Sequence, residues 1–167
     1  MYKHHVYSTS RMNWIKKSKA KTSGCLFCRV ARDDPHVEKE IIYKTKDIMV
    51  AMNIYPYNTG HLQVVPLRHV EKFEELSESE IASLFVMTQK CVKLLKKVLN
   101  PDGFNIGMNI GGDVAGASVM HLHVHVVPRF VRDSGFMEAA CETKVLPQTV
   151  SQVAEKLKKE VKMLKSE

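Results

Sequence analysis

The sequence lacks the long apolar segments of membrane and secreted proteins. No stretch approaches the roughly 20 apolar residues that span a bilayer. The basic beginning of the chain has no apolar core of the kind that a secretory signal needs. With four cysteines and no export signal, we expect a cytoplasmic protein in a reducing compartment. Its cysteines are then thiols or metal ligands rather than disulfides.

The chain also lacks repeats and low-complexity segments, and its 167 residues fit one domain with a proper core. The net charge is +7, and the basic residues gather at the two ends. Such a field attracts anionic ligands, from nucleotides to nucleic acid, although a solvated tail and a solvated helix face are the simpler interpretation at each end. The residues are Lys3, Arg11, Lys16, Lys17, Lys19 and Lys21 at the start, and Lys156, Lys158, Lys159, Lys162 and Lys165 at the finish.

The order of the expected elements predicts an α+β fold with an antiparallel sheet, because strands are followed by a helix and then by strands again. Ser77 and Glu80 have the form of a capping box, and Asn100 with Pro101 stops the helix that follows. Pro147 suits the start of a last amphipathic helix. The apolar stripes are Ile81, Leu84, Phe85, Val92, Leu95 and Leu99 in the first helix and Val150, Val153, Leu157, Val161 and Leu164 in the last, and the expected strands are 41–43, 48–52, 61–66, 103–107 and 120–127.

Three histidines, His121, His123 and His125, alternate along one expected strand. Alternate side chains of a strand point to the same face, so the three imidazoles line one surface, roughly 6.5 Å from one to the next. Imidazoles exchange protons near neutral pH and bind metals, so three of them on a rigid strand predict a reaction site or a metal site. The apolar residues between them point toward the core. Pro128 is expected to end the strand, since proline cannot donate to a ladder.

Two further patterns point to ligand binding. The glycine-rich loop 111–116 precedes the histidine strand, and glycine lets backbone amides approach a phosphate closely. A tight turn between strands would use glycine as well. Cys25 and Cys28 have the spacing of one pair of zinc ligands, and His61 or His69 is a candidate third ligand, since a structural zinc site needs four. A chance pair of reduced thiols is the alternative.

Together these residues resemble the histidine triad superfamily. Residues 121–127 match its motif His-x-His-x-His-x-x, in which x is apolar, and the similarity covers roughly residues 23–130. Supporting matches are Asn53, the pair Gly60 and His61, the cap at Ser77, and Gly116. The segments 11–15, 103–107, 128–130 and 134–137 are similar to the diadenosine tetraphosphate phosphorylase and hydrolase group, near the fragile histidine triad branch.

The resemblance implies a particular architecture. The fold is a five-stranded antiparallel sheet per subunit with one long helix and a C-terminal helix. The histidine triad domain occupies residues 24–130, after a basic arm at 1–23 and before a C-terminal extension at 131–167 that carries the amphipathic helix. The family also implies a homodimer built on the helix that begins at Ser77, with an extended ten-stranded sheet.

The resemblance also assigns roles to the histidines. His123 is the nucleophile that attacks an α-phosphorus and forms a nucleotidyl-histidine, for which a neutral imidazole is suited. His125 contacts the scissile phosphate and helps the leaving group to depart, and His61 supports the triad from beside it. The substrate contacts are Asn53 to the ribose, Ile54 to the nucleoside, and Asn109, Gly116, Ala117 and Ser118 to phosphate oxygens.

A zinc site follows from the zinc-containing bacterial members of the family. They use a Cys-x-x-Cys pair, a histidine after a proline turn and the first triad histidine. The corresponding ligands in this chain are Cys25, Cys28, His69 and His121. The four make a closed, structural site, so that His121 anchors the N-terminal segment rather than exchanging protons.

The implied activity is a nucleotidyl hydrolase or transferase that acts on a diadenosine polyphosphate, with the tetraphosphate favoured. Ala117 stands where many relatives have Gln or Ser, and Phe130 where the phosphorylases have Trp, which leaves the acceptor open: water gives a hydrolase and inorganic phosphate a phosphorylase. An adenosine phosphoramidase is the alternative enzyme. A nucleic-acid-binding or nucleotide-sensing module is the non-catalytic alternative, but such a module does not need three intact histidines. No membrane partner is expected.

Overall fold

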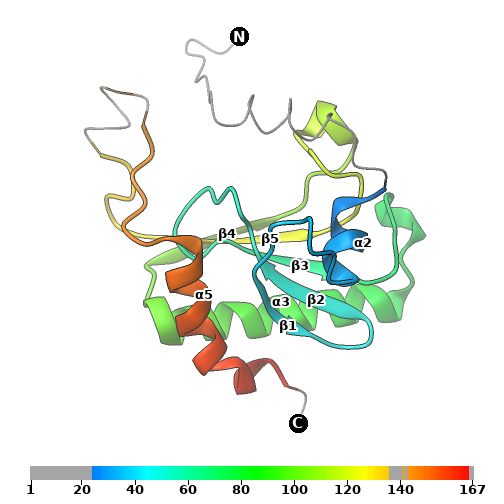
Figure 1. The fold of residues 1–167 in the computed structure, drawn as a ribbon, viewed down its shortest axis with the longest axis horizontal. Helices are drawn as coiled ribbons and strands as arrows, with labels where there is room; N and C mark the ends of the chain where they lie inside the picture. Colours follow the sequence, from blue (N-terminus) through cyan, green and yellow to red (C-terminus); the bar gives the residue numbers. More distant parts are fainter. Residues whose placement is uncertain (1–23, 136–140, 142, 166–167) are drawn as a thin grey trace.

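Five strands form one antiparallel sheet, and a long helix lies across one of its faces (Figure 1). The computed structural model describes residues 24–135, 141 and 143–165, so the expected basic arm at 1–23 lies outside the described residues. The strand order is β1-β2-β3-β5-β4. The prediction of an α+β fold with a five-stranded antiparallel sheet is confirmed. The elements are α2 (Leu26–Ala31), β1 (Ile41–Lys44), β2 (Ile48–Met52), β3 (Leu62–Pro66), the 3-10 helix η1 (Phe73–Glu75), α3 (Glu78–Leu99), β4 (Gly103–Gly107), the 3-10 helix η2 (Gly112–Ala115), β5 (Val124–Arg129), α5 (Val150–Lys159) and the 3-10 helix η3 (Val161–Leu164).

Helix α3 has the predicted ends. The Ser77 hydroxyl accepts from the Glu80 amide, and the Glu80 carboxylate accepts from the Ser77 amide, which together make the capping box. Asn100 closes the helix in the left-handed region, at φ 46°. Phe85, which belongs to the expected apolar stripe, is 45% exposed beside the fully buried Leu84. No helix in the described ranges is long and apolar enough to cross a membrane.

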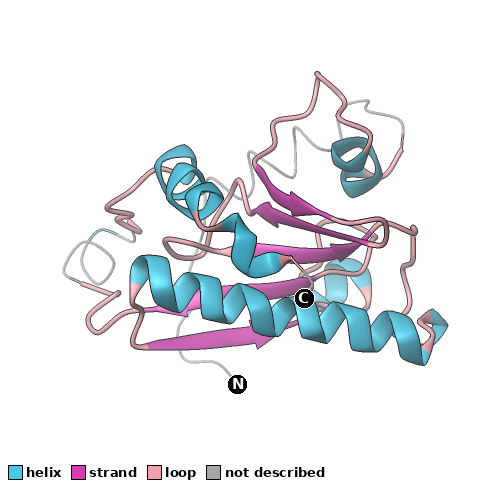
Figure 2. Ribbon diagram, turned by 90° about the horizontal axis from the view of Figure 1, so that it is seen from below, coloured by secondary structure: helices cyan, strands magenta, loops and turns pink. Residues whose placement is uncertain are grey.

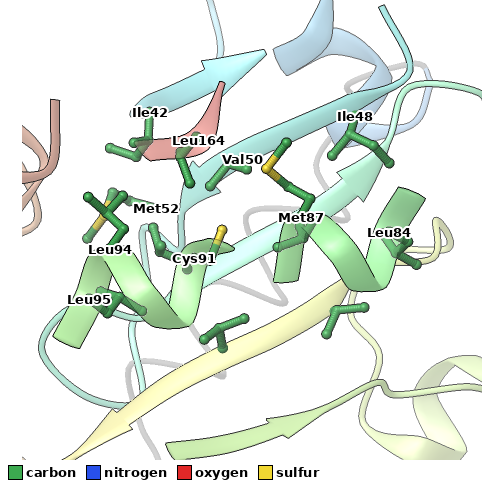
Figure 3. Close-up of a cluster of buried hydrophobic side chains, with 14 of the residues drawn as sticks. Ile42, Ile48, Val50, Met52, Leu84, Met87, Cys91, Leu94, Leu95 and Leu164 are labelled. Carbon is green, nitrogen blue, oxygen red and sulfur yellow. The ribbon is translucent and has the colours of Figure 1, made fainter. Parts of the chain in front are cut away.

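The main hydrophobic core lies between the sheet and the helices α3 and α5 (Figure 2). Figure 3 shows Leu84, Cys91 and Leu95 of α3 in this cluster. Residues Leu122 and Val124, which flank His123, are buried in the same core, as the alternation predicts. The histidines therefore lie on the opposite face of the sheet. That face carries a second cluster of Phe27, Val30, Val37, Met49 and Val65, two of which come from α2.

The histidine strand differs from its prediction at both ends: β5 begins at Val124, so that His121 and His123 precede it, and Pro128 does not end it. Strand β5 runs to Arg129, and Pro128 pairs with Phe104 of β4. The pairing of β5 with β3 stops at Val126, so no ladder beyond that point needs a proline N–H on the β3 side. There the Asn58 side-chain amide donates to the Pro128 carbonyl at 3.0 Å. A proline is therefore tolerated at this end of the strand.

The last helix differs from its prediction at both ends. It begins at Val150, three residues after the expected start at Pro147, because Thr149 forms a capping box with Gln152. It ends at Lys159, and η3 follows as a separate turn that buries Leu164. Both pieces pack their apolar residues against α3 and the sheet.

Candidate active site and metal centre

Three histidines, His61, His123 and His125, come together on the sheet face opposite α3, and we call them the active-site histidines. His61 directly precedes β3, and His125 lies in β5, which pairs with β3. His61 Nε2 is 2.9 Å from His125 Nδ1, and the ring centroids of His123 and His125 are 4.5 Å apart. All three side chains are buried, at 0%, 6% and 9% exposure.

The backbone around His61 admits few alternatives. Gly60 has φ +84°, and a Cβ there would lie 2.4 Å from Leu99 Cδ1 and 3.2 Å from Pro128 Cγ. Only glycine therefore fits immediately before His61. The backbone amide of Asn53 donates to the His61 carbonyl at 2.9 Å, which extends the pairing of β2 with β3 by one step. The backbone of His61 is thus fixed by the tight fit of Gly60 before it and by the hydrogen bond from Asn53.

The hydrogen bonds assign the protons of His61 and His125. The Tyr57 backbone amide donates to His61 Nδ1 at 3.1 Å, so a neutral His61 carries its proton on Nε2. That N–H donates to His125 Nδ1, and the proton of His125 is consequently on its own Nε2. The buried His125 Nε2 has no hydrogen-bond partner among the described residues. It is a donor without an acceptor.

His123 has the opposite arrangement. Its Nδ1 is 2.8 Å from the His121 carbonyl oxygen, which can only accept, so Nδ1 carries the proton and Nε2 keeps a lone pair. The Phe27 ring packs against the His123 ring with centroids 4.9 Å apart and limits its rotation. Adjacent imidazoles therefore present a nucleophilic nitrogen on His123 and an N–H donor on His125.

Burial keeps these imidazoles neutral. It lowers the pKa of His61 to about 3, with further contributions from His125 and His123. Burial, and then the nearby His123, lowers the pKa of His125 to about 4. Burial also lowers the pKa of His123, although its hydrogen bond to the His121 carbonyl acts in the other direction. At neutral pH the lone pair of His123 is therefore available for attack.

A cavity of about 1220 Å³ opens in front of His123 and His125. His61 does not line it and lies behind His125. The Gly116 and Ala117 amides donate to carbonyls within the glycine-rich loop itself, at 3.1 and 2.9 Å. They are directed into the loop, whereas Ser118 at its end is exposed. All six predicted substrate contacts line the cavity, namely Asn53, Ile54, Asn109, Gly116, Ala117 and Ser118.

The second group, which we call the metal cluster, consists of Cys25, Cys28, His69 and His121. Its four ligand atoms all lie within 4.8 Å of one another. With Zn–N of about 2.0–2.1 Å and Zn–S of about 2.3 Å, a tetrahedral ion separates two ligand nitrogens by about 3.3 Å and a nitrogen from a sulfur by about 3.6 Å. The Nδ1 atoms of His69 and His121 are 3.3 Å apart, and three sulfur–nitrogen distances are 3.2, 3.5 and 3.7 Å. The cluster has the size of a zinc site.

The protons of the metal cluster also suit a cation. His121 Nε2 is 2.9 Å from the Pro66 carbonyl and His69 Nε2 is 3.2 Å from the Glu71 carboxylate, so both rings carry their protons on Nε2. Two Nδ1 lone pairs then face each other, an arrangement that a cation between them stabilises. Burial and the neighbouring Cys25 raise the pKa of the Cys28 thiol, so a metal is needed to hold it as a thiolate.

Some contacts of the two groups escaped the sequence analysis. Phe27 touches both His121 and His123, and its position between Cys25 and Cys28 was the available signal. The Tyr57 ring lies 4.9 Å from His61 and 5.8 Å from His125. The Pro66 carbonyl and the Tyr57 amide are backbone groups, for which a sequence contains no residue-type signal.

This geometry coincides with membership of a known family. A family model described as the HIT domain matches residues 34–132, and the chain belongs to this family. Among its relatives, the AP-4-A phosphorylase of Mycobacterium tuberculosis is 36% identical over 149 residues, which is 86% of this chain and 76% of that protein. The asymmetrical bis(5'-nucleosyl)-tetraphosphatase of Schizosaccharomyces pombe is 37% identical over 93 residues, which is 56% of this chain and 50% of that protein.

Solved structures show the same fold. A hypothetical histidine triad nucleotide-binding protein from Sulfolobus tokodaii has a TM-score of 0.70 at 23% identity, over 84% of this chain and 93% of that one. A Zn-bound histidine triad family protein from Mycobacterium smegmatis has a TM-score of 0.68 at 23% identity, over 84% and 95%. The predicted resemblance to the histidine triad superfamily is confirmed, and so is the prediction of an enzyme of this family.

Proposed function

We propose that the protein is a nucleotidyl transferase or hydrolase that cleaves diadenosine polyphosphates, with the tetraphosphate favoured, through a nucleotide bound covalently to His123. The observation that carries this proposal is the lone pair of His123 Nε2 beside the N–H of His125 Nε2 at one cavity. Attack on phosphorus needs the lone pair, and a departing phosphate oxygen is stabilised by the N–H. A cavity of about 1220 Å³ is large enough for a dinucleotide.

The first half of the reaction forms one bond and breaks one. The His123 Nε2 lone pair bonds to the α-phosphorus, and the bond from that phosphorus to the bridging oxygen breaks, with its electron pair leaving on the oxygen. His125 Nε2–H donates a hydrogen bond to this oxygen; a polyphosphate is a weak base and needs no proton to depart. The positive charge on the His123 ring is met by its Nδ1–H bond to the His121 carbonyl. With diadenosine tetraphosphate, ATP leaves and AMP stays on His123.

The second half transfers AMP to an acceptor. An oxygen of inorganic phosphate bonds to the same phosphorus, the bond to His123 breaks with its electron pair returning to Nε2, and ADP is formed. Water in the same place gives AMP and releases one proton to solvent. We favour phosphate, because the phosphorylase relative matches 86% of this chain and the hydrolase relative 56%.

Product analysis tests the acceptor and the activity together. The protein is incubated with diadenosine tetraphosphate with and without inorganic phosphate, and the nucleotides are separated. Phosphate-dependent ADP plus ATP means phosphorolysis, and phosphate-independent AMP plus ATP means hydrolysis. A parallel incubation with an adenosine phosphoramidate tests the alternative enzyme. If no substrate turns over, and His123→Ala leaves nucleotide affinity unchanged, the catalytic proposal is wrong.

We also propose that the metal cluster holds zinc as a structural ion. The support is the tetrahedral spacing of the four ligand atoms and the orientation of both Nδ1 lone pairs into the cluster. Four protein ligands fill a tetrahedral site, so the ion, when bound, fastens α2 to the segment before β5. Elemental analysis of the purified protein is expected to find one zinc per chain.

A homodimer is the proposed assembly. Phe85 and Val86 of α3 are 45% and 53% exposed, and Ile106 is 48% exposed on β4, which is an outer strand of the sheet. A partner that pairs with β4 would cover this edge and extend the sheet. Sedimentation of the wild type and of Phe85→Asp tests it: the wild type is expected to be a dimer and the variant a monomer. A monomeric wild type would contradict the proposal.

A further inference from the structure

The side-chain amide of Asn53 is oriented by its own neighbourhood. The Tyr55 backbone amide donates to Asn53 Oδ1 at 2.9 Å, which fixes the oxygen as the acceptor. The Asn53 Nδ2 group then lies 3.3 Å from His61 Nδ1. Because Nδ2 carries only hydrogens, Asn53 meets His61 as a donor. Asn53 lines the cavity, yet its amide faces the histidine behind the cavity wall.

His61 Nδ1 receives two donors and faces no acceptor among the described residues. The second donor is the Tyr57 backbone amide at 3.1 Å. Both contacts are compatible with only one neutral tautomer of His61, the one with its proton on Nε2. That N–H donates to His125 Nδ1 at 2.9 Å, which leaves the proton of His125 on its buried Nε2, and His125 lines the cavity.

We propose that Asn53 is a positioning residue: through His61 it keeps the N–H of His125 directed at the leaving group. This inference rests on the proposed function, because the value of that N–H lies in the departing polyphosphate oxygen. The alternative tautomer of His125 would turn a lone pair toward the same oxygen, and two lone pairs repel. The donors at His61 Nδ1 therefore determine which ring nitrogen carries the proton, first in His61 and then in His125.

Asn53→Asp is the sharpest variant, because it keeps the shape of the side chain and exchanges a donor for an acceptor. A carboxylate still accepts from the Tyr55 amide, but its other oxygen accepts from His61 Nδ1 and draws the proton there. His61 Nε2 then becomes an acceptor, and His125 donates from Nδ1 instead of Nε2. Asn109→Asp is the matched control, since it adds the same charge to the same cavity, and Asn109 Nδ2 bonds to the Gly116 carbonyl rather than to a histidine.

The test combines NMR and kinetics on the zinc-loaded protein. Nitrogen-15 correlation spectra of the histidine rings report which nitrogen carries each proton, in the absence of substrate. The wild type and Asn109→Asp are expected to show His125 protonated on Nε2, and Asn53→Asp on Nδ1. With diadenosine tetraphosphate, kcat of Asn53→Asp is expected to fall about 10²-fold, as on loss of one oxyanion donor. Asn109→Asp is expected to raise KM instead, through charge repulsion.

Two results would overturn the inference: a wild-type His125 protonated on Nδ1, or a folded Asn53→Asp protein that keeps the Nε2 proton. If Asn53→Asp does not fold, Asn53→Ala serves, because the Tyr57 amide remains. A ring of His61 that samples both tautomers in this variant supports the role of Asn53, and unchanged spectra oppose it. A wild type that turns over no substrate would refute the proposed function, whereas the spectra would still decide the position of the protons.

Discussion

Two groups of histidines lie next to each other on one sheet face and are prepared for different chemistry. In the metal cluster, His69 and His121 both donate from Nε2 to oxygen, so that both Nδ1 lone pairs point inward. Among the active-site histidines, His123 donates from Nδ1 and His125 accepts there. His121, His123 and His125 are the same residue type in one short segment, although β5 begins at Val124 and contains only His125. Their difference comes from the partner of the second ring nitrogen.

The two groups are also joined. The His121 ring belongs to the metal cluster, while its backbone carbonyl accepts the Nδ1–H of His123. Phe27, between the two cysteine ligands, packs against the ring of His123. Fixing His121 and α2 therefore also fixes His123, the proposed nucleophile. The comparison predicts that damage to the active-site histidines leaves the metal in place, whereas damage to the metal cluster affects both.

The largest expected effect is that of His123→Asn on turnover. Loss of the nucleophile is expected to reduce kcat on diadenosine tetraphosphate by about 10⁴-fold or more. Zinc content is expected to stay at the wild-type value, because His123 is not a ligand. Rates and elemental analysis on the same preparation check both statements. A variant that loses its zinc would show that the two groups are not separable.

The double substitution of Cys25→Ser and Cys28→Ser tests the opposite direction. It is expected to abolish stoichiometric zinc binding, to lower the melting temperature by several degrees, and to reduce kcat about 10-fold through the loosened Phe27 and His121. Cys141→Ser is the matched control, because Cys141 is exposed and outside the cluster. Full activity in the zinc-free double variant would show that the metal cluster does not position His123.

Alternation along the chain was enough to predict which face the triad occupies, because a strand has a period of two whatever its surroundings. The resemblance supplied the four metal ligands, which the structure brings together from three separate segments. The tautomers of the histidines could not be predicted from the sequence, since they depend on the Tyr57 backbone amide and on the Pro66 and His121 carbonyls. Pro128 was placed wrongly because its tolerance depends on where β3 stops pairing.

The pH dependence of stability follows from the burial of two of the active-site histidines. The pKa of His61 is lowered to about 3 and that of His125 to about 4, so below pH 6.5 the unfolded chain binds protons that the folded protein excludes. The free energy of unfolding is therefore expected to fall as the pH drops from about 6.5 toward 4. Each group contributes a slope of up to about 1.4 kcal/mol per pH unit. Above about pH 7.5 these two groups contribute no slope.

Urea unfolding of the zinc-loaded protein between pH 8 and pH 5 measures this slope. His61→Gln is expected to be less steep than the wild type by up to about 1.4 kcal/mol per pH unit, because one of the two protons is removed. Zinc release at low pH affects both proteins and cancels in the difference. Identical slopes would mean that His61 is not held neutral by its burial.

The smallest effect concerns Glu71, which touches the metal cluster from outside. Its carboxylate accepts from His69 Nε2 at 3.2 Å, while His69 is 42% exposed on its side chain. An acceptor on Nε2 makes Nδ1 a stronger ligand, and loss of such a partner weakens metal binding by about 10-fold or more. Because the pair is exposed, we expect the lower end of this range for Glu71→Gln.

Competition with a zinc chelator measures the affinity, with Glu74→Gln as a control of equal charge change in the exposed segment that follows. Glu71→Gln is expected to bind zinc about 10-fold more weakly and Glu74→Gln to bind it as the wild type does. At saturating zinc, kcat of Glu71→Gln is expected to be unchanged, because Glu71 contacts neither His123 nor His125. If both variants bind zinc equally weakly, the negative charge near the cluster, rather than the bond to His69, strengthens zinc binding. If both bind it as the wild type does, the bond from His69 to Glu71 does not strengthen zinc binding.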